Sequence, residues 1–352
     1  MVNGSSSLKA LVLRDFTGFS SEEIEFGAQL TVVVGENGSG KSNILRAAYA
    51  GIASLASLDT GRPVKAQVQN VLASKLSGVF RPDSLGRLVR RAQGRLKCRM
   101  DYRFDDPSLH FGCSFSRLAK AEVTVHKLPS QGIAKRPVYL PTRELLSIYP
   151  GFISVYETTH LSFEETWRDT CVLLGAPLAR GPRESAIREL LVPLEDAMEG
   201  KIELDKSGRF YLKTRGSGRM EMHLVAEGLR KLAMVARLIA TGSLLDSGYL
   251  FWDEPEANLN PRLVKLLART ILQIARNGVQ VFIATHSLFL LRELDILCAE
   301  PDEVPLNARY LGLNRGADGA IQLQQGRSMD EIGDIASLDE ELLQSDRYLA
   351  TV

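Results

Sequence analysis

Apolar residues in the second half of the chain follow two alternating patterns. Residues 249–252, and residues 281–284 within the expected strand 279–284, are short, continuous apolar runs, which are typical of strands buried on both faces. Around them, residues 227–241, 263–276 and 288–294 carry apolar side chains at helical spacing. This alternation of buried strands and helices predicts a mostly parallel central sheet covered by helices.

The first half of the chain has a different pattern. Residues 8–15 and 22–26 show β-type alternation around a turn at Gly18, and the apolar run 30–34 follows. This predicts a small antiparallel edge that leads into a buried strand. A helix at 68–76 and alternating strands at 98–104 and 109–115 predict an antiparallel lobe with inserted helices.

The remaining patterns complete an α/β unit. They predict a short strand at 136–141, a helix at 183–198, a hairpin at 202–212, a hairpin at 309–323 and an acidic helix at 329–348. We expect one unit over residues 1–352. It divides into an N-terminal lobe (1–51), an antiparallel and helical insertion (52–200) and a C-terminal lobe (201–352).

Composition excludes several classes of protein. Lys and Arg number 43 against 42 Asp and Glu, so no overall charge points to nucleic acid or an anionic membrane. The four cysteines lack C-x-x-C spacing, which disfavours a zinc site or a disulfide framework. No apolar run approaches the roughly 18 residues that span a bilayer, and residues 1–7 lack the order of a secretory signal. We expect a soluble cytoplasmic protein without membrane contact.

The strongest motif follows the apolar run 30–34. Residues 35–42 match the phosphate-binding pattern G-x-x-x-x-G-K-[ST] at every position, and a helix-forming segment follows. Backbone N–H groups of such a loop surround a polyphosphate, and Lys41 would neutralise its β and γ oxygens. The hydroxyl of Ser42 would be one ligand of Mg²⁺. The predicted nucleotide-binding residues are Gly35, Glu36, Asn37, Gly38, Ser39, Gly40, Lys41, Ser42 and Asn43.

Two further apolar strands end in polar residues. Asp253 and Glu254 directly follow residues 249–252, and His286 follows 279–284. Asp253 would hold the Mg²⁺ shell through water, and Glu254 would take a proton from, or orient, the attacking water. His286 would contact the γ-phosphate or that water. His110, His126, His160 and His223 have no partners at ligand spacing, and we interpret them as structural.

The order of these motifs resembles the ABC-type ATPases, in the RecF/SMC-like branch that includes OLD-family and many phage-defence ATPases. The resemblance rests on the phosphate loop, then Asp253-Glu254-Pro255 with residues 256–261, then residues 285–287, and on residues 11–19. The resemblance is weak between residues 52 and 180. It implies a P-loop NTPase with an ABC-type head, and neither long coiled-coil arms nor a fused nuclease is evident.

The resemblance also implies a dimer in which two heads sandwich two nucleotides. Residues 226–231 match the signature segment, so Glu227 and Gly228 would face the partner's phosphate, although Ala226 or Glu227 replaces the usual serine. Asn258 would lie in the loop against the partner head. Arg14 and Phe16 would approach the base or α-phosphate. Residues 142–144 occupy the place of a Mg²⁺-sensing glutamine.

Three functions follow from these patterns. The first is an ATP-hydrolysing switch that dimerises, or forms a higher homo-oligomer, and controls a separately encoded effector in anti-phage defence, for which a nuclease is one candidate. The second is a DNA-binding repair ATPase of RecF type, because six basic residues lie between Arg87 and Arg99 with no acid from 86 to 100. A solvated surface also explains that basic stretch. The third, a transporter's nucleotide-binding subunit, is disfavoured by residues 13–19 and by the signature.

Overall fold

A six-stranded sheet forms the centre of the structure. The computed structural model describes residues 6–58, 61–159, 161–181, 184–216, 218–300, 304–316 and 319–351. The sheet has the order β14-β13-β3-β12-β11-β7. Its strands are β7 (Val138–Leu140), β11 (Tyr249–Asp253), β12 (Gln280–Thr285), β3 (Leu30–Gly35), β13 (Ala308–Arg315) and β14 (Ile321–Gly326). Only β14 is antiparallel to its neighbour, so the predicted mostly parallel sheet is confirmed.

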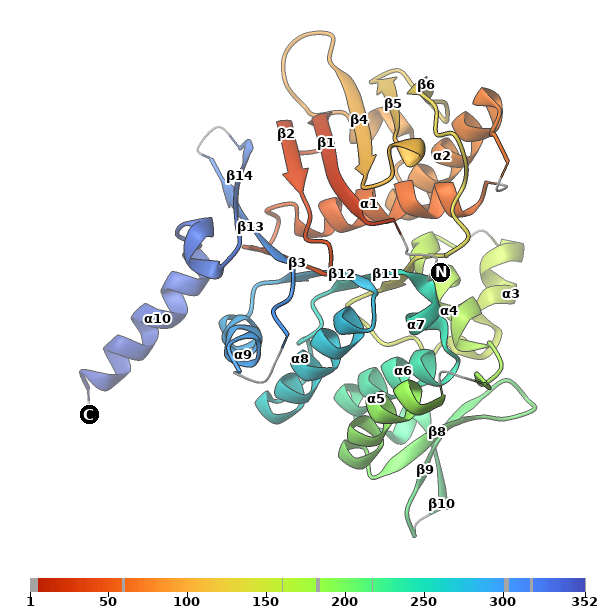
Figure 1. Ribbon diagram of the computed structural model, residues 1–352, viewed down its shortest axis with the longest axis vertical. Helices are drawn as coiled ribbons and strands as arrows, with labels where there is room; N and C mark the ends of the chain where they lie inside the picture. Colours follow the sequence, from red (N-terminus) through yellow and green to blue (C-terminus); the bar gives the residue numbers. More distant parts are fainter. Residues whose placement is uncertain are drawn as a thin grey trace.

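A second, antiparallel sheet is built from the first half of the chain and lies at the top of the view in Figure 1. Its order is β2-β1-β4-β5-β6. The strands are β1 (Leu8–Phe16), β2 (Phe19–Glu25), β4 (Lys97–Phe104), β5 (Phe111–Ser116) and β6 (Thr124–Lys127). Because β1 pairs with β4, this sheet contains strands from both the expected N-terminal lobe and the expected insertion, whose boundary was placed at residue 51.

Two hydrophobic clusters lie on opposite faces of the central sheet. The helix α1 (Lys41–Ala56) packs between the two sheets, and α2 (Lys65–Phe80) packs beside it, against α1 and β6. On the other face lie α6 (Glu227–Ala240), α8 (Pro261–Arg276) and α9 (Leu288–Cys298). Alternation along β3 sends Val33 into the first cluster and Val32 and Val34 into the second. The continuous apolar runs of the sequence therefore correspond to strands covered on both faces.

The segment between β7 and α6 contains elements that the sequence patterns did not predict. These are α3 (Tyr149–Thr159) and α4 (Glu165–Leu174). Pro150 and Gly151 have non-helical dihedrals inside α3, which interrupts the helical pattern there. The expected helix at 183–198 is α5 (Glu184–Ala197), and the expected hairpin becomes a three-stranded sheet of β8 (Gly200–Leu204), β9 (Phe210–Thr214) and β10 (Gly218–Glu221). Arg183 and His160 lie outside the described residues.

The C-terminal part begins with the expected hairpin, β13 and β14, and continues into helical segments. The expected helix at 329–348 is interrupted: Met329–Ile332 is a 3-10 turn, Gly333 has φ of 70°, and α10 (Ala336–Leu349) follows. Figure 1 shows α10 directed away from the sheets. A short helix, α7 (Ser243–Ser247), precedes β11. In the described part of the chain, none of the helices is long and apolar enough to span a bilayer.

We predict that Gly51→Ala destabilises the protein. Alanine in a helix is normally favoured over glycine by about 1 kcal/mol, but a Cβ at Gly51 would overlap the buried ring of Tyr102. That ring is fixed because Tyr102 Oη donates to Ala47 O at 2.9 Å. We expect a decrease of about 1–3 kcal/mol in the free energy of unfolding, measured by urea denaturation. The exposed Ser74→Ala in α2 is the matched control, and equal stability of both variants would contradict the packing argument.

Candidate active site

The phosphate loop connects the end of β3 to the start of α1. Gly38 and Gly40 have φ of 80° and 99°, a left-handed conformation that glycine adopts without strain. A Cβ at Gly40 would also lie 2.7 Å from Ile321 Cδ1. Glu36 and Asn37 are exposed at the tip of the loop. The loop therefore has the tight backbone that lets successive N–H groups face an anion.

Lys41 is held at the base of this loop. Its side-chain Nζ donates to Gly35 O at 2.6 Å and to Glu36 O at 2.9 Å, and the residue is 5% exposed. Burial lowers the pKa of Lys41, while the negative charges of Glu254 and Asp253 oppose this shift. The ammonium thus lies between the loop and the acids at the end of β11, which β12 separates from β3 in the sheet. A polyphosphate in the loop would meet this positive charge.

Two further loop residues have defined surroundings. Ser39 Oγ is buried and has no hydrogen-bond partner in the described chain. Asn43 Nδ2 donates to Thr17 Oγ1 at 3.3 Å, which ties the first turn of α1 to the turn between β1 and β2. The nucleotide-binding loop is therefore fixed to both sheets of the molecule.

The residues predicted to bind Mg²⁺ are in contact. Asp253 ends β11, is 6% exposed and lies close to the Ser42 hydroxyl. Burial raises the pKa of Asp253, opposed by Ser42 and by the positive charge of Arg46. Tyr139 Oη donates to Asp253 Oδ2 at 3.5 Å. Because a carboxylate and a hydroxyl are hard oxygen donors, this pair fits a magnesium ion bound with phosphate and water.

Glu254 and His286 come together from the ends of β11 and β12. Their strands are paired in parallel, with Asp253 opposite Ala284. His286 Nδ1 lies 3.4 Å from Glu254 Oε1, which is ion-pair distance without hydrogen-bond alignment. Glu254 has φ of 47°, and its N–H donates to Ala284 O at 2.8 Å. The turn directs a partly exposed carboxylate and an imidazole to the same edge as the phosphate loop.

A buried lysine supports this turn. Lys231 is 2% exposed, and its Nζ donates to Glu254 O at 2.7 Å and to Ala257 O at 3.2 Å. Burial lowers the pKa of Lys231 to about 8. Glu256 is half-buried and accepts from Thr285 Oγ1 at 2.6 Å. The sequence interpretation gave Lys231 and Glu256 no role; the only signal was a lysine adjoining the apolar stripe of α6.

The predicted signature residues gather at the N-terminus of α6. Asn258 Nδ2 donates to Glu227 Oε1 at 3.0 Å, and a Cβ at Gly228 would lie 2.6 Å from Asn258 O. The structure therefore brings these three residues together, and their contact with a partner's nucleotide stays a prediction. In the loop after β7, Glu144 is buried and lies 2.9 Å from Arg230 Nε. Its carboxylate also accepts from Ser147 N at 3.1 Å and from Ser147 Oγ at 2.6 Å, so it is held by its own loop as well as by α6.

The two predicted residues of β1 have different environments. Phe16 is fully buried and packs edge-on against Phe80, with ring centroids 5.5 Å apart. The expected contact of Phe16 with a base is therefore corrected, because its ring belongs to the core between α2 and the N-terminal sheet. Arg14 is exposed and lies opposite Arg99 in the register of β1 and β4. Its contact with nucleotide stays a prediction.

Comparison with protein families gives two matches. The model described as "AAA domain, putative AbiEii toxin, Type IV TA system" matches residues 30–292, from the first residue of β3 to within α9. A second model, described as "AAA domain", matches residues 10–48. The first match spans more than half of the chain and contains the phosphate loop, both acids and the histidine described above.

Curated relatives match over short segments. The DNA replication and repair protein RecF of Synechocystis sp. is 55% identical over 40 residues, 11% of this chain and 10% of that protein. RecF of Enterobacter sp. is 33% identical over 99 residues, 27% of each chain. The chain thus spans about a tenth and about a quarter of the length of these relatives.

Solved structures resemble the chain over most of its length. One is an Smc head bound to the C-winged helix domain of ScpA, with a TM-score of 0.56, 15% identity and coverage of 92% of this chain and 98% of that one. Another is the Smc head with an extended coiled coil from Pyrococcus furiosus, bound to the C-terminal domain of ScpA. Its TM-score is 0.55, with 14% identity and coverage of 97% and 100%. At this identity the likeness shows the fold, which is an SMC-type head.

We predict that Lys231 makes stability depend on pH. Its pKa falls from 10.5 to about 8 on folding, so between these values the unfolded chain binds more protons. Stability from this group therefore rises as pH increases from about 8 to 10.5, and it is lost as pH falls back from 10.5 to about 8. We expect the unfolding free energy of wild type minus that of Lys231→Met to rise by about 2 kcal/mol between pH 7 and 10. Lys65→Met, at an exposed lysine of α2, is the control. If the difference in unfolding free energy between wild type and Lys231→Met did not change with pH, the burial effect would be refuted.

Proposed function

This chain belongs to the family described as "AAA domain, putative AbiEii toxin, Type IV TA system", and from this premise we propose that it is an ATP-hydrolysing molecular switch. ATP would close two copies head to head, and hydrolysis would open them. One observation carries this proposal. The phosphate loop, the Asp253–Glu254 pair and His286 follow three neighbouring parallel strands, β3, β11 and β12, at one edge of the sheet.

The side chains at this edge have separable roles in hydrolysis. Lys41 binds the β and γ oxygens and offsets their charge. Glu254 accepts a proton from the attacking water through its carboxylate, and His286, 3.4 Å away, orients that water or contacts the γ-phosphate. Ser42, and Asp253 through water, would hold Mg²⁺, which would supply further charge neutralisation.

Dimerisation is supported by the N-terminus of α6. Glu227, Gly228 and Asn258 form one cluster there, and the free N–H groups of a helix N-terminus favour a phosphate. We place the γ-phosphate held by a second copy against this cluster. The expected assembly is a homodimer or a higher homo-oligomer, in line with the SMC-type head fold.

The switch would act on a separately encoded effector in anti-phage defence, and a nuclease is one candidate. The family description, with its putative toxin and Type IV TA system, supports a role of this kind. The conformational difference between closed and open dimers is what such an effector would recognise.

A basic surface next to the phosphate loop supports a second candidate function, DNA repair of RecF type. A pocket of about 470 Å³ is bordered by Gly38 and Asn43 and by four arginines, Arg87, Arg90, Arg91 and Arg315. Some of the basic stretch is neutralised, because Arg90 pairs with Asp15, Arg87 with Asp83 and Arg99 with Asp101. Arg91, Arg95 and Lys97 are exposed, which leaves positive charge available to nucleic-acid phosphates.

We predict that Glu254→Gln keeps nucleotide binding and stops turnover. The amide cannot accept the proton, so the hydrolysis rate should fall at least about 100-fold while an ATP-dependent dimer accumulates, as measured by light scattering. Lys41→Met is the contrasting variant. It should weaken ATP binding by about 2–5 kcal/mol because a buried charge contact is lost. Unchanged turnover in Glu254→Gln would remove Glu254 from the proposed role.

For the repair alternative, we predict DNA binding that weakens steeply with salt. Reversing two exposed charges, Arg91→Glu with Arg95→Glu, should reduce the slope of log K against log salt by about 2. Lys206→Glu, in the exposed β8–β9 turn, should leave the slope unchanged. Fluorescence anisotropy over a salt series measures both. Absent or salt-independent binding in the wild-type chain would retire this candidate.

A further inference from the structure

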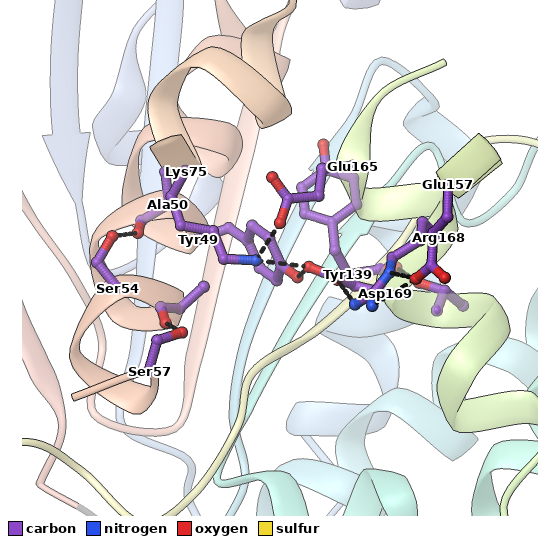
Figure 2. Close-up of polar contacts among 12 residues, drawn as sticks. Tyr49, Ala50, Ser54, Ser57, Lys75, Tyr139, Glu157, Glu165, Arg168 and Asp169 are labelled. Atoms are coloured by element: carbon purple, nitrogen blue, oxygen red, sulfur yellow. Dashed lines mark hydrogen bonds and ion pairs between the residues drawn. The ribbon is translucent and has the colours of Figure 1, made fainter. Parts of the chain in front are cut away.

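The start of α4 carries three acidic side chains that hold the phosphate-loop helix and its neighbour α2. Glu164, at the cap position of α4, lies 2.6 Å from Arg46 of α1. Asp169 accepts from Tyr49 Oη of α1 at 2.7 Å and lies 3.1 Å from Lys75 of α2. Glu165 also pairs with Lys75, at 2.5 Å. Figure 2 shows the Tyr49, Lys75, Glu165 and Asp169 side chains converging between these helices.

Arg46 connects this acidic group to the metal site. It lies four residues after Ser42 on α1, so the two side chains share one face of the helix. Arg46 lies close enough to the Tyr139 hydroxyl to interact with it electrostatically, and Tyr139 Oη donates to Asp253 Oδ2 at 3.5 Å. The side chain of Arg46 is 26% exposed, and within the described residues its buried Nε has no hydrogen-bond partner. A half-buried cation therefore stands near the carboxylate that would face Mg²⁺.

The charges of Arg46 and Glu164 have opposite effects on a divalent cation near Asp253. A guanidinium close to Asp253 would form an ion pair with it and repel a divalent cation. Glu164, on the other side of Arg46, supplies the compensating negative charge. Since the guanidinium is planar and its N–H groups point in fixed directions, the bond to Glu164 also decides where those groups point.

We propose that Glu164 is a positioning residue that holds the Arg46 guanidinium away from Asp253, so that Asp253 and Ser42 are free to receive Mg²⁺ with the nucleotide. This inference rests on the proposed ATP-binding function. It gives the start of α4 a part in metal loading, because a movement of α4 would change the charge beside Asp253. The α3–α4 insertion is thereby coupled to the nucleotide site.

The test is a Mg²⁺ titration of the binding of a fluorescent ATP analogue to the full chain. In Glu164→Gln, Arg46 loses its counter-charge and turns to Asp253, so half-maximal binding should need roughly tenfold more Mg²⁺. Binding of the analogue in EDTA should stay unchanged. The double variant Arg46→Met with Glu164→Gln should return to the wild-type requirement, because the competing cation is gone.

Glu165→Gln is the matched control, since this neighbouring acid pairs with Lys75 and not with Arg46. It should leave the Mg²⁺ requirement unchanged. A wild-type requirement in Glu164→Gln, an equal increase in Glu165→Gln, or no recovery in the double variant would each overturn the proposal. If Glu164→Gln does not fold, Arg46→Met is titrated by itself. A higher Mg²⁺ requirement in Arg46→Met would overturn the proposal, because removing the competing cation should not weaken Mg²⁺ binding. A wild-type chain that binds no nucleotide at any Mg²⁺ concentration would instead refute the proposed ATPase.

Discussion

The parallel hydrogen bonding of β3, β12 and β11 is the constraint on which the rest of the site depends. The register places Val34 opposite Thr285 and Asp253 opposite Ala284. Since neighbouring parallel strands end at the same edge, the phosphate loop, the histidine and the two acids meet although they lie far apart in the chain. The hydrophobic clusters on both faces hold this register, because a slip by one residue would turn each strand's side chains to the opposite face.

One buried cation and two half-buried ones then hold the loops at this edge. Lys231 bonds the backbone of the turn that carries Glu254, Arg230 lies against Glu144 in the loop after β7, and Arg46 pairs with Glu164 at the start of α4. In an environment of low dielectric, a charge without a partner is costly, so movement of the partner groups away from each cation is unfavourable. The site is thereby built from two helices, α1 and α6, whose basic side chains reach opposite sides of β11.

The outer parts of the molecule connect to these two helices. The N-terminal sheet covers α1 and contacts the phosphate loop through Thr17 and Asn43. The segment between β7 and α6 contacts α1 and α2 through α4. A ligand that binds either outer part can therefore influence the nucleotide site without touching it, which is the physical basis that a switch requires.

The sequence by itself determined the features that depend on neighbouring residues. The phosphate loop, the acids after residues 249–252, the histidine after 279–284 and the alternation of strands and helices all have local patterns. Only the tertiary structure decided that Phe16 belongs to the core, that β1 joins β4, and that Lys231 supports the Glu254 turn. The helices α3 and α4, and the contact of Glu164 with Arg46, had no local signal either. The physical reason is that these features arise from contacts between residues distant in the chain, and no local periodicity or spacing encodes which distant groups a fold will bring together.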